Sequence, residues 1–366
     1  MGFSPFAKTR ISIGFSQTIR SKISMKKIAY IEIDTHAEIA ADFLDLMKDS
    51  KAFSVDYYFS EKIKKQIQGS SENIFLSDSS LILDQLQAKN YDLIIIGTVH
   101  RYFNTFLNVT QKYKSAVIVH NLNFSKASRL DLIKNIFKED SIYRLKLWWK
   151  EGLFNASKVY KKAKQLLVLD QTFSSSEYQF LPLCYTKDFH QNRNEFLTIV
   201  IPGGVSQKRR DYQHVLNVIQ NSGESKKIEF VLLGKAKGEE LESIEKVAEK
   251  FNVTYFTERV SQKDFEIWMK KADVLWCPIQ QKTQFFSQEE IYGKTKMTGN
   301  IGDAIKFGKM AVFPKNYSSN LGFIIQEKEN IIQQFDELKK LKYDFQKDYN
   351  KEIVLRNLEN LLFKLI

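Results

Sequence analysis

The segment from Glu290 to Pro314, EIYGKTKMTGNIGDAIKFGKMAVFP, combines a glycine-rich loop, polar side chains and the start of a helix. The first turn of a helix leaves backbone N–H groups unpaired and carries the positive end of the helix dipole, so it favours an anion. Glycines let the backbone approach a ligand, and cationic or neutral donors bind its oxygens. The residues of these kinds are Gly293, Lys294, Thr295, Lys296, Thr298, Gly299, Asn300 and Gly302. The segment predicts a phosphate site, with a solvated surface loop as the alternative.

Two carboxylates in this segment, Glu290 and Asp303, could accept hydrogen bonds from hydroxyl groups of the same ligand. Residues 303–307 predict a short helix, and Gly308 is typical of the left-handed residue that ends one. The apolar residues 310–313 then predict a buried strand that ends before Pro314.

A second glycine turn occurs earlier, in IPGGVSQKRRDYQHVL, where Gly203 and Gly204 follow an apolar strand-like run. Three cations come next, namely Lys208, Arg209 and Arg210. Backbone donors and cations at such a turn can stabilise the charge that develops on a diphosphate leaving group. The spacing matches neither the Walker loop nor GxGxxG, which argues against ATP hydrolysis and hydride transfer. A tight turn with solvated charges is the alternative interpretation.

A similar turn follows the next strand-like run, IEFVLLGKAKG, which places Gly234 and Lys235 at its end. In α/β sheets, ligands bind beyond the carboxyl ends of the strands. Both turns are therefore expected at one edge of one sheet, where their cations would serve the same anion.

Three histidines, His36, His100 and His120, each come just beyond a strand-like run in the first half of the chain. By the same rule they could face one cleft. A single histidine would usually be structural, but three at matching strand ends suggest a site for an acceptor. His120 with Asn121 is the preferred polar pair on that side. No Ser-His-Asp order and no carboxylate pair at helical spacing supports hydrolysis.

The chain has 366 residues, of which 43% are hydrophobic, so two domains with their own cores are expected. Cys184 and Cys277 lie far apart and fit no metal or redox spacing, which indicates free thiols in a reducing, cytoplasmic setting. The histidines form no zinc motif, and no bound metal is expected. No apolar run approaches the roughly 20 residues that cross a bilayer.

The formal net charge of +12 suggests an anionic partner. Residues 126–164 hold most of the clustered cations, together with Trp148, Trp149 and many aliphatic side chains. A basic helix with interfacial aromatics suits an anionic membrane surface. The alternative is an amphipathic helix whose apolar side faces the core. Binding to nucleic acid is the weaker interpretation because the aromatics match no recognised motif, and none is expected.

Strand-like and helix-like runs alternate along most of the chain, which is typical of doubly wound α/β domains. One set covers residues 25–185 and a second covers residues 196–345, with an aperiodic linker near residues 181–195. Residues 346–366 predict a C-terminal helix. Residues 1–24 contain four cations and no acid, and are expected to be a disordered extension, with a targeting role as the alternative.

With these residues identified, residues 25 to 366 resemble glycosyltransferases of the GT-B fold, family 4. The family motif has a glutamate, an aromatic residue followed by glycine, an acid followed by alanine, then a glycine and a buried strand. The matching residues are Glu290, Tyr292–Gly293, Asp303–Ala304, Gly308 and the run AVFP. The chain departs from the motif because its second acid is Asp303 rather than glutamate, and because several residues are inserted between Gly293 and Asp303.

The resemblance implies two Rossmann-like domains that face a central cleft, with a final helix that returns to the first domain. It implies that Glu290 contacts the donor sugar, that Asp303 contacts the ribose, and that Lys208 holds the diphosphate. It also makes His120 the acceptor-side histidine. The family has an arginine at the position of Gly203, so Arg209 or Arg210 would have to replace it.

The activity that the resemblance implies is sugar transfer from a nucleoside diphosphate sugar, without metal or separate cofactor and usually with retained configuration. Together with the basic segment, it suggests a lipid-linked saccharide or polysaccharide acceptor at the cytoplasmic face of a membrane. A catalytically inactive GT-B scaffold that binds a nucleotide sugar or a partner glycosyltransferase is the alternative.

Overall fold

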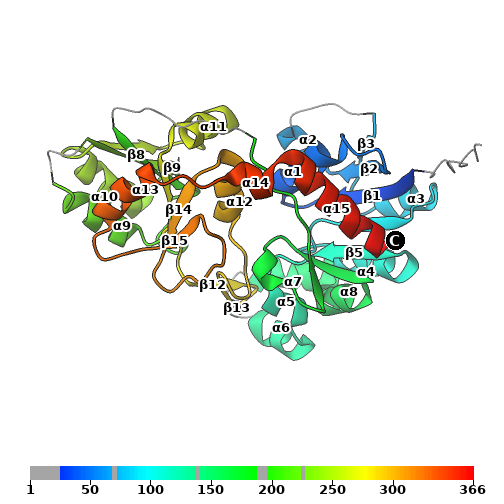
Figure 1. The fold of residues 1–366 in the computed structure, drawn as a ribbon. Helices are drawn as coiled ribbons and strands as arrows, with labels where there is room; N and C mark the ends of the chain where they lie inside the picture. The colour runs from blue at the N-terminus through cyan, green and yellow to red at the C-terminus, as the bar shows by residue number, and fades with distance from the viewer. Residues whose placement is uncertain (1–24, 68–71, 137, 139–140, 188–195, 224–226) are drawn as a thin grey trace, which may run out of the picture.

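The computed structural model describes residues 25–67, 72–136, 138, 141–187, 196–223 and 227–366. They form two α/β halves that lie side by side, each built on a parallel sheet surrounded by helices (Figure 1). The prediction of two doubly wound α/β units is therefore confirmed. The predictions for residues 1–24, and for the linker from residue 188 to 195, fall outside the described residues. In the described part of the chain, no helix is long and apolar enough to cross a membrane.

The first half contains a seven-stranded parallel sheet with the order β3-β2-β1-β4-β5-β6-β7. Its strands are β1 (Lys26–Glu32), β2 (Phe53–Phe59), β3 (Ile74–Leu76), β4 (Leu93–Ile96), β5 (Ser115–Ile118), β6 (Gln165–Val168) and β7 (Tyr178–Phe180). Every residue of β4 and β5 is buried, as expected for strands covered on both faces. The strand order reverses between β1 and β4, and such a switch point is where open α/β sheets bind ligands.

The helices of the first half pack on both faces of this sheet, with one core cluster around Phe43 and another around Phe106. They are α1 (Ala37–Met47), α2 (Glu61–Gln66), α3 (Ile82–Gln87), α4 (Phe103–Lys112), α5 (Leu122–Lys126), α6 (Arg129–Ile136), α7 (Ser141–Lys146) and α8 (Ala156–Lys162), with the short helices η1 (Leu147–Glu151), η2 (Leu153–Asn155) and η3 (Gln171–Phe173). The basic segment was expected to form one helix, but it is divided into several. One division comes at Gly152, whose φ of 73° is left-handed and separates η1 from η2.

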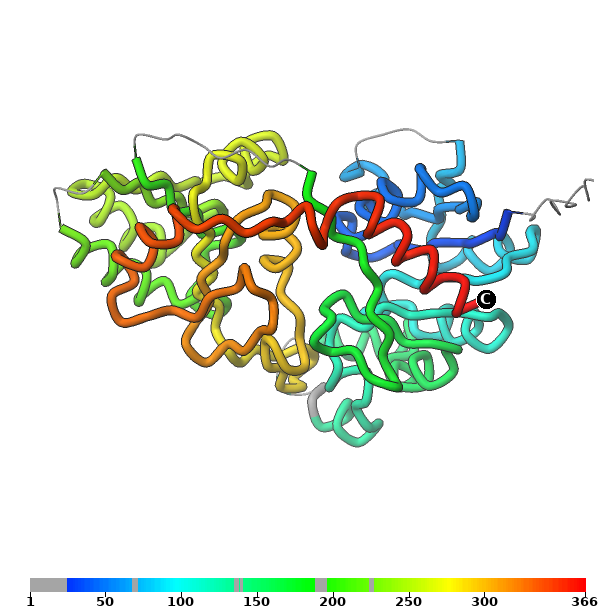
Figure 2. The backbone as a smooth tube through the Cα atoms, viewed as in Figure 1, coloured from blue at the N-terminus to red at the C-terminus, as the bar shows by residue number. Residues whose placement is uncertain are grey.

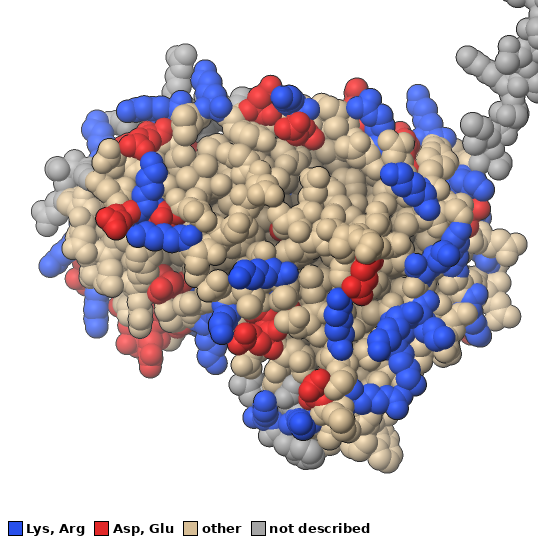
Figure 3. Space-filling view, turned by 60° about the horizontal axis from the view of Figure 1, so that its bottom comes forward, with Lys and Arg blue, Asp and Glu red and all other residues tan. Residues whose placement is uncertain are grey.

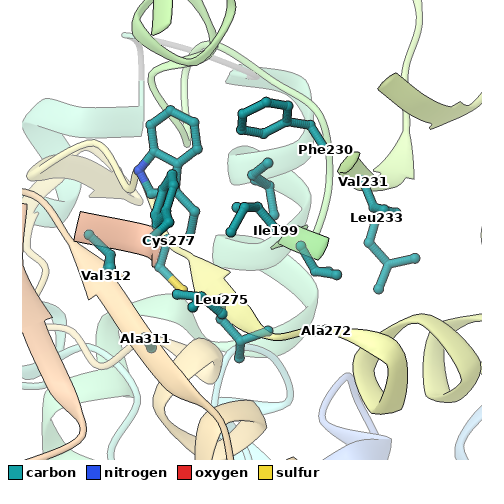
Figure 4. Packing of buried hydrophobic residues seen from close by; sticks show 14 of the residues in the cluster. Ile199, Phe230, Val231, Leu233, Ala272, Leu275, Cys277, Ala311 and Val312 are labelled. Atoms are coloured by element: carbon teal, nitrogen blue, oxygen red, sulfur yellow. The ribbon is translucent and has the colours of Figure 1, made fainter. Parts of the chain in front are cut away.

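The second half contains a six-stranded parallel sheet with the order β10-β9-β8-β11-β14-β15. Its strands are β8 (Leu197–Pro202), β9 (Ile228–Lys235), β10 (Val253–Phe256), β11 (Val274–Trp276), β14 (Met310–Phe313) and β15 (Ile324–Gln326), and its helices are α9 (Tyr212–Gln220), α10 (Gly238–Ala248), α11 (Gln262–Lys271), α12 (Gly299–Phe307) and α13 (Ile331–Lys340). Ile199, Leu275 and Val312 from three neighbouring strands share one buried cluster, part of which Figure 4 shows.

A two-stranded antiparallel hairpin, β12 (Lys282–Phe285) and β13 (Gln288–Ile291), extends from the second half and contacts α5. The sequence predicted only a loop in this region. The two turn residues, Phe286 and Ser287, have φ angles of 49° and 56°, which non-glycine residues rarely adopt. The Asn-Gly pair that usually indicates a hairpin turn is absent, so the sequence did not predict a hairpin here.

The chain crosses between the halves twice (Figure 2). The first crossing leads through the residues up to 187, and the second through α14 (Phe345–Tyr349) to α15 (Lys351–Leu365). Leu358 and Leu362 of α15 are buried in the same cluster as Phe43 of the first half. The region from Asn330 onward, which has a helical pattern in the sequence, forms three helices, α13, α14 and α15. The division arises because the side chains of Asp344 and Asn350 cap the starts of α14 and α15.

Candidate functional site

A cavity of about 1300 Å³ lies between the two halves. Its wall is formed by strand ends of the first sheet, by the hairpin and α12 of the second half, and by α14 and α15. Typical small-molecule sites have volumes of roughly 300–1,000 Å³. This cavity is therefore larger than a typical small-molecule site.

The three histidines lie together in the cavity wall. His36 follows β1, His100 follows β4 and His120 follows β5, and these strands are neighbours in the sheet. The rings of His36 and His120 stack with their centroids 4.1 Å apart. The ring of His100 stands edge-on to both, at 5.9 Å from His36 and 5.5 Å from His120. The rule that ligand-binding residues follow the carboxyl ends of the strands, called the strand-end rule below, thus correctly predicted that these three distant residues lie together.

Hydrogen bonds determine which nitrogens of His100 and His120 carry a proton. His120 Nε2 lies 2.8 Å from the carbonyl oxygen of Gly97, so Nε2 donates and Nδ1 is left as an acceptor. His100 Nε2 lies 3.2 Å from the amide nitrogen of Asn121, so Nε2 accepts. Burial lowers the pKa of both imidazoles well below the usual value, and the nearby His36 lowers it further. Both rings are therefore neutral at pH 7.

His36 differs from its two neighbours in protonation. Burial lowers its pKa, but a hydrogen bond of 2.7 Å to Glu38 and the charges of Glu38 and Glu32 outweigh burial, so the pKa is raised overall. The cluster combines one imidazole that protonates readily with two that stay neutral. Among the described residues, no group of three or more His, Cys, Asp or Glu side chains is arranged to hold a metal ion.

Arg210 lies over the glycine turn of the second half, next to Arg209, which lines the cavity. Gly203 has a φ of 104°, and a Cβ placed there would lie 2.2 Å from Nη2 of Arg210. The guanidinium therefore fills the space beside Gly203. Its Nη1 donates to the carbonyl oxygen of Gly204 at 3.2 Å, and its Nη2 donates to Asn300 Oδ1 at 3.4 Å. Its Nε is buried and has no hydrogen-bond partner among the described residues.

Helix α12 begins next to this guanidinium. The side chain of Thr298 caps the helix by accepting from the backbone N–H of Asn300 at 3.3 Å, so the helix starts at Gly299 rather than at the predicted residue 303. Neither Gly204 nor Gly299 has an atom within 4 Å of the position of an added Cβ. The first turn of α12 and the glycine turn therefore border open space beside a cation, and this arrangement favours an anion.

Asp303 lies in the second turn of α12 and lines the cavity. Burial raises its pKa to about 6, although the charge of Lys306 and a hydrogen bond from Asn300 lower it. Lys306 also lines the cavity and forms an ion pair of 2.6 Å with Asp42 of α1, which joins the two halves. Gly302 permits the close approach of the first crossing, since a Cβ there would lie 3.0 Å from the sulfur of Cys184.

Solved structures resemble this arrangement, whereas no family model and no curated protein sequence matches the chain. A sucrose-phosphate synthase from Thermosynechococcus elongatus is 13% identical with a TM-score of 0.56, over 93% of this chain and 99% of that one. HepE from Anabaena, in complex with UDP, is 9% identical with a TM-score of 0.57, over 93% of this chain and 100% of that one. The chain has the GT-B fold. UDP-GlcNAc 2-epimerase from Neisseria meningitidis, bound to UDP-GlcNAc, also resembles it, with 10% identity and a TM-score of 0.52 over 93% of this chain and 100% of that one.

In this GT-B fold, the loop after β13 binds the first half instead of projecting freely. The carbonyl oxygen of Thr295 accepts from the N–H of Leu122 at 2.8 Å, and Lys296 Nζ donates to Asn121 Oδ1. Lys296 and Tyr292 both line the cavity. Burial lowers the pKa of Lys296, although the charge of Glu290 opposes this.

Glu290 is fully buried and is not among the residues that line the cavity. Its Oε1 accepts from the N–H of Phe124 at 2.9 Å, and its Oε2 accepts from the N–H of Asn123 at 3.4 Å. Burial raises its pKa, while these hydrogen bonds lower it. Glu290 thus caps α5 of the opposite half, which differs from the donor-sugar position that the resemblance implied.

Four of the predicted cations do not line the cavity, namely Lys208, Arg210, Lys235 and Lys294. Lys208 is exposed in the turn at residues 207–209 and does not line the cavity. Lys294 is exposed as well, and Lys235 forms an exposed ion pair of 3.2 Å with Glu258. Arg209 does line the cavity. Arg209 by its position in the lining, and Arg210 by its contact with Asn300 in the first turn of α12, are better placed for an anion than Lys208.

Two of the predicted glycines have a packing role. A Cβ on Gly234 would lie 2.3 Å from the carbonyl oxygen of Gly203, so the residue lets the ends of β8 and β9 approach. Gly293 has a φ of 78°, and a Cβ there would lie 2.8 Å from the ring of Tyr317.

The sequence reasoning missed two polar features of the cavity. Asp170, two residues after β6, lines the same cavity as the histidines. The strand-end rule would have found it, because QLLVLD is a strand-like run that ends in this acid. The ion pair between Lys306 and Asp42 had no sequence signal, since both residues lie within ordinary amphipathic helices.

Proposed function

We propose that this chain is a glycosyltransferase that moves a sugar from a nucleoside diphosphate donor to an acceptor hydroxyl. The proposal rests on the Arg210 guanidinium, which is held on the Gly203–Gly204 turn and donates to Asn300 in the first turn of α12. The neighbouring Arg209 and Gly299 line the same cavity as the three clustered histidines. A diphosphate requires cations and backbone N–H donors, and neutral imidazoles suit a hydroxyl. In this proposal, residues 25–185 form the acceptor domain, residues 196–345 the donor domain, and residues 346–366 the helix that joins them.

In the proposed reaction, the acceptor hydroxyl forms a bond to the anomeric carbon while the bond from that carbon to the diphosphate oxygen breaks. The departing diphosphate carries the bonding electrons. Arg209, Arg210 and the first turn of α12 stabilise its charge, with Lys296 at the cavity wall. His120 Nδ1, which is available as an acceptor, orients the acceptor hydroxyl. The proton of this hydroxyl is transferred either to the departing diphosphate or to His120 Nδ1. Closure of the two halves excludes water and limits hydrolysis of the donor.

The first donors to test are uridine diphosphate sugars. HepE was solved with UDP, and the epimerase was solved with UDP-GlcNAc. These ligands were found in those two proteins, and we extend them to this chain only because the fold is shared. By the resemblance to family 4, the transfer retains configuration and requires no metal. Asp303 is the proposed partner of the ribose hydroxyls, because it lines the cavity within α12.

For the acceptor, we propose a lipid-linked saccharide or polysaccharide precursor in cell-surface glycan synthesis, used at the cytoplasmic face of a membrane. The basic segment, residues 126–164, carries exposed apolar side chains, with Ile142 85% and Trp149 82% exposed. Exposed cations at Lys134, Lys146 and Lys150 lie in the same segment. Figure 3 shows Lys and Arg side chains on this face, more densely toward the first half. Aromatic rings and cations together favour an anionic bilayer surface.

An inactive nucleotide-sugar scaffold is the second candidate. One observation favours it: Glu290, which the family motif places at the donor sugar, is buried and bound to α5. Such a scaffold would bind a nucleotide sugar or a partner glycosyltransferase without turnover.

The deciding experiment has two steps. Thermal unfolding of the full chain is first measured with UDP, GDP and a panel of their sugars, since a ligand of the native state raises the melting temperature. The stabilising donor is then incubated with membrane extract, and the sugar product is separated and identified. A new glycosidic product supports the proposal, whereas binding without any product favours the scaffold. An epimerised sugar as the sole product, or no stabilisation by any nucleotide sugar, would overturn the transfer proposal.

A further inference from the structure

Asp170 holds a buried, unsatisfied carboxylate oxygen at the cavity wall. The side chain lines the cavity and is only 4% exposed. Its Oδ1 accepts from the N–H of Thr172 at 3.0 Å and from its hydroxyl at 2.7 Å. Its Oδ2 is buried and has no hydrogen-bond partner among the described residues. The position of Oδ1 is therefore fixed by Thr172, whereas Oδ2 is buried without a hydrogen-bond donor among the described residues.

Other acids of the cavity are already satisfied. Glu38 accepts from His36, Asp42 is paired with Lys306, and Asp303 accepts from Asn300. A buried carboxylate oxygen without a donor destabilises the folded chain, because desolvation of the charge is not offset. Asp170 therefore gains more than Glu38, Asp42 or Asp303 from a ligand that brings a hydrogen-bond donor.

The position of Asp170 assigns it to the acceptor side of the cavity. The strands β1, β4, β5 and β6 are consecutive in the sheet, and each is followed by a polar residue of the wall. These residues are His36, His100, His120 and Asp170. The cations near the proposed diphosphate, by contrast, belong to the second half.

Two tyrosines from later in the chain lie near this carboxylate, and one of them, Tyr349, also lines the cavity. Burial raises the pKa of Tyr317 and of Tyr349, and the charge of Asp170 contributes to both shifts. Asp170 is therefore close to these two aromatic side chains. A negative oxygen in such surroundings repels phosphate and suits a neutral hydroxyl donor.

We propose that Asp170 Oδ2 accepts a hydrogen bond from a hydroxyl group of a saccharide acceptor and thereby helps to select that acceptor. The inference rests on the proposed function, because it names a contact on the acceptor side of the same cavity. Thr172 fixes the rotation of the carboxylate, so the direction of Oδ2 is set before the sugar binds.

The test compares Asp170→Asn with the wild-type chain. Asparagine retains an oxygen for Thr172 and replaces Oδ2 by an N–H donor, which cannot accept from a hydroxyl. The probes are methyl glycosides of glucose, galactose, mannose and N-acetylglucosamine, added to protein saturated with UDP or with the nucleotide that stabilises it. Their binding is measured by saturation-transfer NMR titration. We expect the best glycoside to bind about ten- to a hundredfold more weakly to the variant, as for loss of a hydrogen bond to a charged group.

Asp34→Asn is the matched control. Asp34 Oδ2 is also buried without a hydrogen-bond partner among the described residues, but Asp34 is not among the residues that line the cavity. The same chemical change there should leave glycoside affinity within about twofold of wild type, whatever it does to stability. A nucleotide titration of both variants shows whether each still folds and binds the donor.

A series of monodeoxy forms of the best glycoside locates the contact. The glycoside that lacks the relevant hydroxyl should bind weakly to wild type, and Asp170→Asn should weaken it no further. Equal binding of every glycoside to wild type and Asp170→Asn would overturn the inference, as would failure of all four glycosides to bind wild type. In either case intact nucleotide-sugar binding and transfer would leave the proposed function standing. Loss of those two activities in wild type is instead a failure of the proposed function.

Discussion

Oε1 of Glu290, in the hairpin of the second half, accepts the backbone N–H of Phe124, in α5 of the first half, at 2.9 Å. The contact is reinforced on both sides. The ring of Phe286 stacks on Phe124 with centroids 5.2 Å apart, and Thr295 accepts from Leu122 at 2.8 Å. The hairpin and its following loop therefore hold the two halves together at the edge of the cavity. Glu290, which the resemblance places at the donor sugar, forms part of the contact between the halves.

Glu290→Ala is expected to lower the free energy of unfolding by about 1–3 kcal/mol, because the buried N–H of Phe124 would lose its acceptor. Glu290→Gln retains an amide oxygen for this N–H and should cost less. Urea unfolding of the two variants measures the difference. Glu289→Ala is the control, since Glu289 is the exposed neighbour and uses only its backbone oxygen to bind Asn123. If Glu290→Ala has normal stability but no turnover, Glu290 would instead contact the donor sugar, as the family resemblance implies.

Arg210→Ala is expected to weaken the binding of a nucleoside diphosphate by about tenfold or more, because it removes a charge-assisted donor beside α12. Isothermal titration with UDP, or with the nucleotide that stabilises the chain, measures the change. Lys208→Ala should have a smaller effect, since Lys208 is exposed and outside the cavity lining. Lys246→Ala, on the exposed side of α10, controls for the loss of one charge from the same half. If Lys208→Ala costs as much as Arg210→Ala, the loop must rearrange to bring the lysine to the phosphate.

The histidine cluster predicts three different titrations. His36 should titrate above its ordinary pKa of about 6.5, and His100 and His120 well below it. NMR of ring-labelled histidines, assigned with single His→Asn variants, measures each pKa directly. Titration of all three near 6.5 would show that the rings are solvated and apart, and the stacked cluster would be wrong.

The same shifts give opposite contributions to stability. His36 has a raised pKa in the folded chain, so its contribution is present below about pH 6.5 and is lost as pH rises through the folded pKa. His100 and His120 have lowered pKa values, so each contributes above about pH 6.5 and loses up to ~1.4 kcal/mol per pH unit below it. His120→Asn should therefore flatten the loss of stability on acidification, which urea unfolding at several pH values measures.

The sequence predicted those parts of the fold and site that depend on local patterns. Apolar runs such as the one ending at Gly97 identified the central strands, and the strand-end rule brought His36, His100 and His120 to one wall. Short strands such as β3 and β7, with three residues each, were missed because so few residues show no periodicity.

The remaining parts depend on contacts between residues that are distant in the sequence. Arg210 reaches the position beside Gly203 because its side chain folds back over the glycine turn, and no spacing rule reports such a rotamer. Glu290 reaches Phe124 only because the hairpin turn at Phe286 and Ser287 adopts positive φ without glycine. The family motif predicted that Glu290 contacts a ligand, whereas in the structure its carboxylate accepts a hydrogen bond from the backbone of Phe124.

The exposed apolar residues of the basic segment predict binding to anionic lipid. Ile142→Ser should weaken association with vesicles of phosphatidylglycerol and phosphatidylcholine by roughly tenfold, because one aliphatic side chain no longer enters the interface. Co-sedimentation with the vesicles measures the bound fraction.

Ile267→Ser is the matched control for this prediction, because Ile267 is also an exposed isoleucine, 50% exposed, but lies on α11 of the second half. It should bind vesicles like wild type. Pure phosphatidylcholine vesicles should bind the wild-type chain more weakly, since Lys134, Lys146 and Lys150 then meet no anionic lipid. Equal loss in both isoleucine variants would show that association follows general surface hydrophobicity, and the basic segment would then have no special part in it.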